Sequence, residues 1–114
     1  RRAAMQQGMA AFMQDYDLLL CPTAIVPPFP VEQRYVAELN GHHFPSYIDW
    51  VTIAFAITLT GCPALSLPCG FTRSGLPVGL QLVGKPRGEA TLIAAAAAME
   101  DLLGLAGKVP MTPT

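Results

Sequence analysis

The residues able to perform nucleophilic chemistry in this chain are serines and cysteines, and none stands in an activating motif. Ser66 lies between two leucines in ALSLP, without the sharp G-x-S-x-G turn that exposes a serine nucleophile. Cys62 and Cys69 have no cationic neighbour in the sequence that would favour a thiolate. With Cys21 they form no zinc-ligand or CxxC spacing, so we expect free, mostly buried thiols. Composition and spacing therefore assign no catalytic residue.

Two histidines and one aspartate are the remaining candidates for acid–base or metal chemistry. His42 and His43 are adjacent beside Gly41 and cannot share a helical face, and no third ligand stands at a suitable spacing. We expect exposed loop histidines, with a substrate-facing role as the alternative. Asp49 follows Ser46 by three residues, which predicts a capping box; a general base is the alternative. No G-x-G-x-x-G motif precedes a helix, and we predict neither metal nor cofactor.

A pair of aromatic residues fits a binding wall. Tyr47 and Trp50 stand three residues apart, which places them on one face at the start of a helix predicted over 46–60. We expect them to contact an apolar group of a ligand, and His43, just before that helix, is a third candidate. The alternative is that both aromatic residues belong to an ordinary core.

The elements that position these residues follow from hydrophobic periodicity. It predicts an α/β fold with helices over 3–14, 46–60 and 89–103, and strands over 18–21, 64–67 and 78–83. Gly75 in TRSGLP favours a turn, so the last two strands should pair as an antiparallel hairpin, with the first strand in the same small mixed β-sheet. A short helix is expected over 32–40, ended by Gly41.

The helices are expected to bury defined faces against this sheet. The 46–60 segment is apolar nearly all round and should be buried. In the first helix the expected apolar face consists of Met5, Met9, Phe12 and Tyr16. In the last helix it consists of Leu92, Ile93, Ala96, Met99 and Leu103.

Composition limits the classes of partner. The 114 residues are 52% hydrophobic and 13% charged, with a net charge of −1, so no field attracts nucleic acid or an anionic membrane. The longest nearly apolar run, 50–59, is too short to span a bilayer, and no signal peptide is recognisable, so we expect a cytoplasmic protein. So few charges cannot cover the surface, and we expect self-association through an exposed sheet edge or apolar face.

Three segments resemble one known family. LTGCPALSLPCGFTRSGLPVGLQLVGKPRGEATLIAAAAAME is similar to the C-terminal block of the amidase signature family. YDLLLCPTAIVPPFP resembles the preceding strand and proline-rich loop of that family, and YIDWVTIAFAITLTG resembles the helix between them. The resemblance covers residues from roughly 12 to 103 in unbroken order. Relatives often have Asn where Thr58 precedes LTG, which leaves the substrate class open.

The resemblance implies hydrolysis or transfer of an amide group by a Lys–Ser–Ser triad. In the family the lysine and the glycine-serine-rich segment with both serines lie upstream of the matched block. The lysines here are Lys85 and Lys108, the serines are Ser46, Ser66 and Ser74, and none sits in a glycine-serine-rich segment. The resemblance therefore implies that 1–114 is the C-terminal part of a single amidase domain that is inactive alone. Its partner would be a small-molecule amide, contacted by Tyr47, Trp50 and His43. The alternative is a non-catalytic, amidase-like assembly module.

Overall fold

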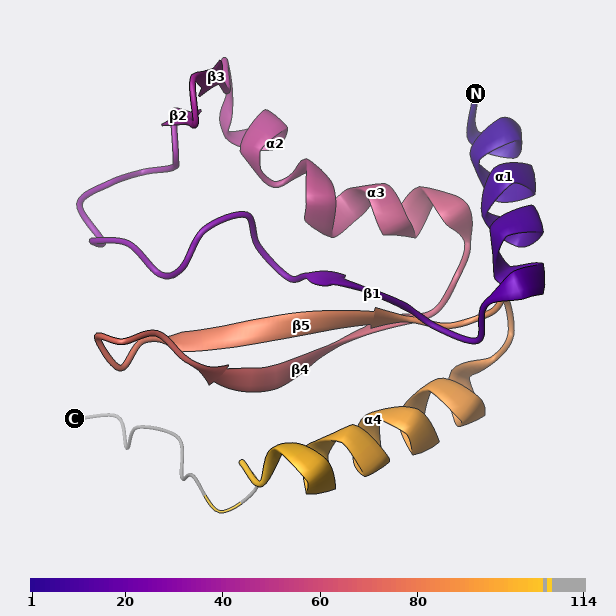
Figure 1. The fold of residues 1–114 in the computed structure, drawn as a ribbon. Helices are drawn as coiled ribbons and strands as arrows, with labels where there is room; N and C mark the ends of the chain where they lie inside the picture. The colour runs from indigo at the N-terminus through magenta and orange to yellow at the C-terminus, as the bar shows by residue number, and fades with distance from the viewer. Residues whose placement is uncertain (106, 108–114) are drawn as a thin grey trace.

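The chain folds as an α/β unit of helices around a small antiparallel sheet (Figure 1). The computed structural model describes residues 1–105 and 107. Its elements are α1 (Arg2–Asp15), β1 (Leu19–Pro22), β2 (Glu38–Leu39), β3 (His42–His43), α2 (Tyr47–Trp50), α3 (Thr52–Thr60), β4 (Ala64–Phe71), β5 (Pro77–Val83) and α4 (Glu89–Leu103). The predicted fold class and hairpin are confirmed.

β5 is the central strand of the main sheet. The strand order is β1-β5-β4, with Leu19 opposite Val83 in one ladder and Ala64 opposite Val83 in the other. Both ladders are antiparallel, so the three strands described form an antiparallel rather than a mixed sheet. Gly75 adopts a φ of 83° in the β4–β5 turn, where its N–H donates to the carbonyl of Thr72 at 3.0 Å. This left-handed conformation is the one that glycine adopts without strain.

β4 is longer than the sequence predicts because a bulge carries it past a proline. Pro68 pairs with Gly79, and the register then shifts so that Gly70 pairs with Val78. Proline has no N–H to donate to a ladder and is tolerated in edge strands and bulges. Because β4 is an edge strand of this sheet, Pro68 does not end it.

The two faces of the sheet carry two separate hydrophobic clusters. On one face α4 buries Leu92 and Ala96 against Leu67 and Leu82. The second cluster joins Met13 of α1 with Cys62 and Val83, and Ile57 of α3 packs against it. Figure 1 shows α4 on one side of the sheet, with α3 on the other side and α1 beside its end.

The buried faces of α1 and α4 differ in part from those expected. Met13, only 2% exposed, is the buried residue of α1, and Met9 packs beside it one turn earlier. Phe12 and Tyr16 instead stack on each other at the surface, with their ring centroids 4.6 Å apart. On α4 the expected Leu92, Ala96 and Met99 face the sheet, whereas Ile93 and Leu103 are exposed. On α4 the sheet covers a narrower stripe than the apolar residues mark, whereas on α1 the buried side is rotated toward Met13, which packs with Cys62 and Val83 beside Ile57 of α3.

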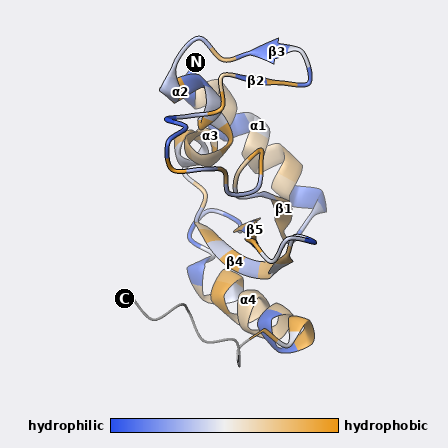
Figure 2. Ribbon diagram, turned by 90° about the vertical axis from the view of Figure 1, so that its left-hand side faces the viewer, coloured by the Kyte–Doolittle hydropathy of each residue, from blue (hydrophilic) through white to orange (hydrophobic). Residues whose placement is uncertain are grey.

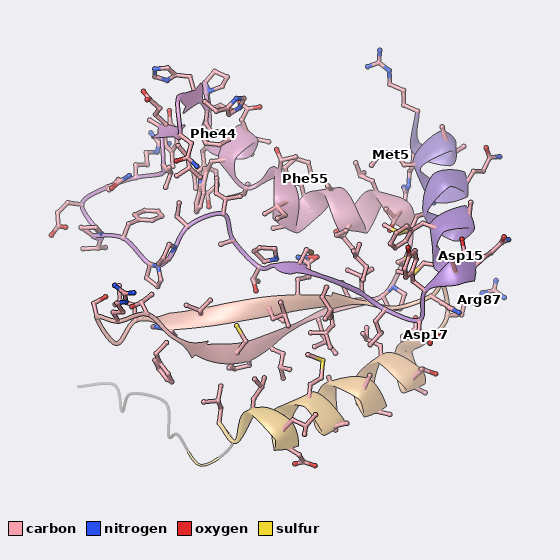
Figure 3. The ribbon with its side chains drawn as sticks, in the orientation of Figure 1. Met5, Asp15, Asp17, Phe44, Phe55 and Arg87 are labelled. Atoms are coloured by element: carbon pink, nitrogen blue, oxygen red, sulfur yellow. The ribbon has the colours of Figure 1, made fainter. Side chains whose placement is uncertain are left out.

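The segment 46–60 is not one buried helix. It divides into α2 and α3 at Val51, where the Asp49 carbonyl accepts from the Val51 N–H and also from the Thr52 hydroxyl, the latter at 2.7 Å. The expected reciprocal capping box is absent too, since the Ser46 hydroxyl donates to the Asp49 carboxylate at 2.5 Å. Figure 2 shows the apolar character of α3, whose Phe55, labelled in Figure 3, remains 40% exposed.

The helix expected over 32–40 is wrong: residues 32–37 form turns and irregular structure, and 38–43 forms a hairpin. β2 and β3 pair through Glu38 with His43 and Leu39 with His42. Asn40 and Gly41 between them both have positive φ, 51° and 78°. An Asn-Gly pair favours this two-residue hairpin turn, so the sequence did carry the signal.

Candidate functional site

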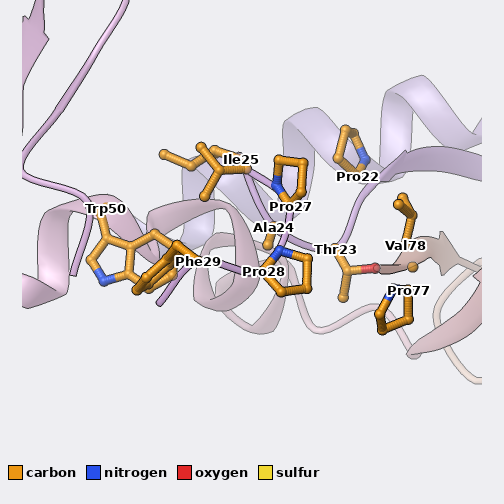
Figure 4. Close-up of a pocket in the computed structure, with 12 residues that line it drawn as sticks. Pro22, Thr23, Ala24, Ile25, Pro27, Pro28, Phe29, Trp50, Pro77 and Val78 are labelled. Atoms are coloured by element: carbon orange, nitrogen blue, oxygen red, sulfur yellow. The ribbon is translucent and has the colours of Figure 1, made fainter. Parts of the chain in front are cut away.

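A cavity of about 440 Å³ lies where β1 ends and β5 begins. Its lining residues belong to the proline-rich loop after β1, to α2 and to the start of β5 (Figure 4). They are Pro22, Thr23, Ala24, Ile25, Val26, Pro27, Pro28, Phe29, Trp50, Pro77, Val78 and Gly79. None of these side chains is charged, so the cavity suits an apolar, uncharged group.

Prolines hold the loop that forms one wall of this cavity. Pro27, Pro28 and Pro30 have fixed φ and no N–H, so the segment can join neither a helix nor a central strand. The loop is attached to the sheet at its start, where the Thr23 N–H donates to the Gly79 carbonyl at 3.3 Å. The proline-rich loop therefore begins beside the first residues of β5.

Aromatic rings connect this wall to α2. The Phe29 and Trp50 rings meet edge to face, with centroids 5.6 Å apart. Trp50 in turn meets Tyr47 at 6.2 Å, and Tyr47 meets Tyr35 at 6.4 Å, both edge to face. Such arrangements add about 0.5–1.5 kcal/mol per pair beyond the area they bury. The row fixes the position of Trp50 at the cavity.

The three residues expected to bind a ligand occupy different positions. Trp50 lines the cavity. Tyr47 is absent from the lining, is 49% exposed and supports Trp50 through its ring. His43 lies on the β2–β3 hairpin, where its Nε2 is 3.3 Å from the Glu38 carboxylate and its side chain is 79% exposed. The structure thus brings Tyr47 and Trp50 together, and His43 lines no part of the cavity.

Sequence reasoning missed the other half of the cavity. Phe29 was visible only as one apolar residue in a proline-rich loop, and its ring contact with Trp50 depends on the path of that loop. Thr23 and Gly79 come together only through the pairing of β1 with β5. No local signal in the sequence marks this contact, because the register of β1 on β5 is set by tertiary pairing.

Two hydroxyl groups approach each other beside Gly79, that of Thr23, which lines the cavity, and that of Ser66, which does not. Thr23 Oγ1 and Ser66 Oγ are 3.5 Å apart, the outer limit for a hydrogen bond. Gly79 lies beneath them: a Cβ at this position would be 2.6 Å from Thr23 Oγ1 and 3.2 Å from Ser66 Oγ. A glycine inside a strand often marks such a close approach. The bare backbone of Gly79 is therefore what leaves room for both hydroxyls.

The same face of the sheet holds a buried amide without a partner. Gln81 pairs with Ser66 on one side and Cys21 on the other, so these three side chains project from one face. Gln81 is 6% exposed, and its Oε1 accepts no hydrogen bond from the residues described. Burial raises the pKa of the neighbouring Cys21 thiol above its ordinary value, because desolvation disfavours the thiolate.

No triad is assembled within 1–105 and 107. The partners of Ser46, Ser66 and Ser74 are Asp49, Thr23 and Thr72 respectively. Lys85 contacts Asp17 at 3.4 Å, at the opposite end of β1 from the cavity, and Figure 3 labels Asp17 there; Lys108 lies outside the described residues. Within the described part of the chain, none of these serines contacts a lysine or a histidine.

The described residues contain no metal-binding cluster, no disulfide and no helix able to span a membrane. They contain no cluster of three or more His, Cys, Asp or Glu residues placed to hold a metal ion, and their three cysteines are free. None of their helices combines the length and apolar character needed to cross a bilayer.

The chain has relatives among known proteins in both sequence and structure. The sequence matches the Amidase family over residues 1–93, and the chain belongs to that family. It is 43% identical over 101 residues to the A subunit of the glutamyl-tRNA(Gln) amidotransferase of Moorella thermoacetica, covering 88% of this chain and 19% of that protein. It is 34% identical over 110 residues to an acylamidase of Rhodococcus erythropolis, covering 96% of this chain and 23% of that protein.

The solved structures agree with the family. A bacterial aryl acylamidase of the amidase signature family superposes with a TM-score of 0.75 and 25% identity, covering 96% of this chain and 24% of that one. The chain thus spans about a fifth of the length of the relatives named above. It belongs to a family of enzymes that act on amides, and the resemblance in its sequence is confirmed.

Proposed function

We propose that 1–114 is the C-terminal part of a cytoplasmic amidase and forms the wall that holds the acyl or aryl group of a carboxylic amide. The observation that carries this proposal is the cavity of about 440 Å³ with no charged lining side chain, closed on one side by Phe29 and Trp50. The nucleophile and its base are contributed by a segment outside 1–114. The aryl acylamidase and acylamidase relatives support an apolar amide as substrate.

Trp50 and Tyr47 have different roles in this proposal. Trp50 contacts the substrate, and Tyr47 positions Trp50 through their edge-to-face contact at 6.2 Å. His43 remains a proposed substrate contact, and its place on the β2–β3 hairpin requires that hairpin to reach the substrate.

The test is ammonia or amine release from matched aryl and aliphatic amides, using the natural protein that contains these residues. Trp50→Ala should lower kcat/KM for aryl amides by about tenfold, since loss of the ring contacts and of apolar area costs about 1–2 kcal/mol. Tyr47→Ala should produce a smaller loss of the same kind. Tyr16→Ala is the matched control, because Tyr16 stacks on Phe12 at the surface of α1.

The same assay tests where the nucleophile lies. The segment 1–114 alone should release no ammonia above background, because losing the nucleophile, base and oxyanion donors removes most of an enhancement of at least about a millionfold. Turnover by the purified segment, abolished by Ser66→Ala, would overturn this assignment. Equal kcat/KM for Trp50→Ala and the unaltered protein would instead remove the proposed binding wall.

A second candidate function is a non-catalytic assembly module. The observation in its favour is the exposed apolar surface of α2 and α3, which includes Ile48, Phe55 and Leu59. The natural protein would then show no turnover of any amide and would form a complex through this surface. Amide turnover by the natural protein would exclude this candidate.

A further inference from the structure

The tip of the β2–β3 hairpin holds a pair of residues that can react with each other. Asn40 and Gly41 form its two-residue turn, and Asn40 is the only asparagine in the sequence. The backbone nitrogen that follows an asparagine can attack the side-chain carbonyl of that asparagine. Glycine leaves this approach open because it has no Cβ. Asparagine is accordingly counted among the thermolabile residues of proteins.

Both reacting groups are accessible in the structure. Asn40 and Gly41 are exposed, and nothing lies within 4 Å of a Cβ placed on Gly41. The ladder joins 38–39 to 42–43, so the Gly41 N–H lies outside it. Among the described residues this N–H has no hydrogen-bond acceptor. The attacking nitrogen is therefore neither covered nor held.

The conformation of the turn nevertheless keeps the two groups apart. Asn40 has a φ of 51° and Gly41 a φ of 78°, the left-handed pair typical of a two-residue hairpin turn. In the left-handed region ψ is about +30° to +60°, which places the Asn40 Cβ and the Gly41 nitrogen on opposite sides of the Cα–C bond. Ring closure needs these two atoms on the same side. The reaction must therefore wait until the hairpin opens and Asn40 rotates about ψ.

Few contacts oppose this opening. The hairpin has two residue pairs and lies apart from the main sheet in Figure 1, and an isolated two-stranded ribbon is marginally stable in water. At its base the Phe44 N–H donates to the Ala37 carbonyl at 2.8 Å. Beyond that bond the Tyr35 and Tyr47 rings meet edge to face at 6.4 Å. The ladder, this bond and the ring contact should each reduce the open population by about two- to tenfold.

We propose that Asn40 is a site of spontaneous deamidation and that the β2–β3 hairpin controls its rate. In the open form the Gly41 N–H gives its proton to hydroxide, and its nitrogen bonds to Asn40 Cγ. The Cγ–Nδ2 bond then breaks, and Nδ2 takes a proton from water and leaves as ammonia. Water opens the resulting succinimide at either carbonyl, which gives aspartate or isoaspartate. The net reaction consumes water and involves no oxidant or cofactor. This inference is independent of the proposed function of the cavity.

The two products affect the hairpin differently. Aspartate tolerates the left-handed conformation, so the turn can form again. Isoaspartate leads the chain through Cβ and Cγ and so lengthens the backbone between Leu39 and His42, which a two-residue turn joins in the unmodified protein. Isoaspartate therefore makes the open form permanent.

The experiment measures the conversion of Asn40 in the natural protein held at neutral pH. Trypsin cuts after Arg34 and Arg73, and the peptide 35–73 between them contains no glutamine and no other asparagine. Its mass therefore reports this one side-chain amide, and chromatography separates the aspartate and isoaspartate forms. Conversion in the folded protein should be about ten- to thousandfold slower than in the free peptide 35–73, because the closing contacts must break first.

Tyr35→Ala tests whether the hairpin contacts control the rate. Loss of the ring contact with Tyr47 should raise the rate in the folded protein by about two- to tenfold and leave the rate in the free peptide unchanged. Tyr16→Ala is the matched control, because it removes a ring contact with Phe12 on α1. It should leave the rate in the folded protein unchanged.

Three results would overturn the proposal. Equal rates in the folded protein and the free peptide would show that the hairpin exerts no control. An unchanged rate in Tyr35→Ala, or an equal increase in Tyr16→Ala, would show that the hairpin contacts do not limit opening. Conversion more than about a thousandfold slower in the folded protein than in the peptide would remove Asn40 as a modification site, since three such contacts cannot reduce the open population further.

Discussion

Gly79→Ala is the substitution whose effect the structure defines most closely. Gly79 has an ordinary strand φ, so alanine adds no backbone strain, and the effect comes from the added methyl group. That methyl would lie 2.6 Å from Thr23 Oγ1 and 3.2 Å from Ser66 Oγ, so Thr23 must move. Overpacking of this kind costs about 1–3 kcal/mol, and the lower entropy of the unfolded chain returns about 0.4–1 kcal/mol. We expect a net loss of about 1–2 kcal/mol in the free energy of unfolding.

The double variant Gly79→Ala/Thr23→Ala tests the cause. Removing the Thr23 hydroxyl leaves its Cβ as the nearest Thr23 atom, 3.4 Å from the new methyl, which is an ordinary contact. The double variant should therefore recover most of the lost stability, with a coupling energy of about 1–2 kcal/mol. The assay is urea unfolding of the natural protein followed by circular dichroism.

A matched glycine provides the control. Gly8 lies within α1 with nothing within 4 Å of an added Cβ, so Gly8→Ala should stabilise the helix by about 0.5–1 kcal/mol. The reasoning fails if Gly79→Ala is as stable as the unaltered protein. It also fails if the free energies of Gly79→Ala and Thr23→Ala simply add in the double variant, because no steric conflict would then join the two positions.

Three other predictions concern the core, a thiol and the exposed helix. Leu82→Ala should lower the free energy of unfolding, measured by chemical denaturation, by about 2–5 kcal/mol, because Leu82 is 0% exposed on the central strand. Leu102→Ala is the control: Leu102 is exposed on α4, so its loss should lower the same free energy by less than about 0.5 kcal/mol. Burial raises the pKa of Cys21, so its contribution to stability should be complete below the ordinary thiol pKa and decline as pH rises through the raised value. Iodoacetamide should accordingly modify Cys21 more slowly than a free cysteine at pH 8, and a rate equal to that of free cysteine would contradict the shift. Phe55→Ser with Leu59→Ser should reduce self-association of the 1–114 segment in sedimentation at about 100 µM; a segment that is monomeric before substitution would refute the predicted association.

The sequence predicted those elements whose signals are local. The hairpin of β4 and β5 follows from Gly75 between two apolar runs, and Gly61 and Gly104 end α3 and α4 with positive φ. The break at Val51 was not foreseeable from periodicity, because the spacing of apolar residues does not encode the local contacts found there, such as the Thr52 hydroxyl donating to the Asp49 carbonyl. The buried side of α1 depends on where Met13 meets Cys62 and Val83, which the apolar spacing of the helix alone does not specify.

In the candidate site, too, the sequence predicted the residues that local spacing brings together and missed those that depend on tertiary structure. Trp50 and Tyr47 were identified because helical spacing alone brings them together. Phe29 and Thr23 were missed because their positions require the path of a proline-rich loop and the β1–β5 register. The Asn40-Gly41 turn is a different case, since its signal was present in the sequence and the wrong element was favoured.

The order β1-β5-β4 has a consequence for synthesis on the ribosome. β5 is the shared partner of both other strands, yet it is translated after both of them. Leu19 can pair only after Val83 has been synthesised, about 60 residues later. Translation of that length takes roughly 3–12 seconds at about 5–20 residues per second. Nascent chains halted before Pro77 should therefore display β1 and β4 with unpaired backbone groups. We expect such stalled chains to be captured by chaperones, and chains extended past Val83 to be released.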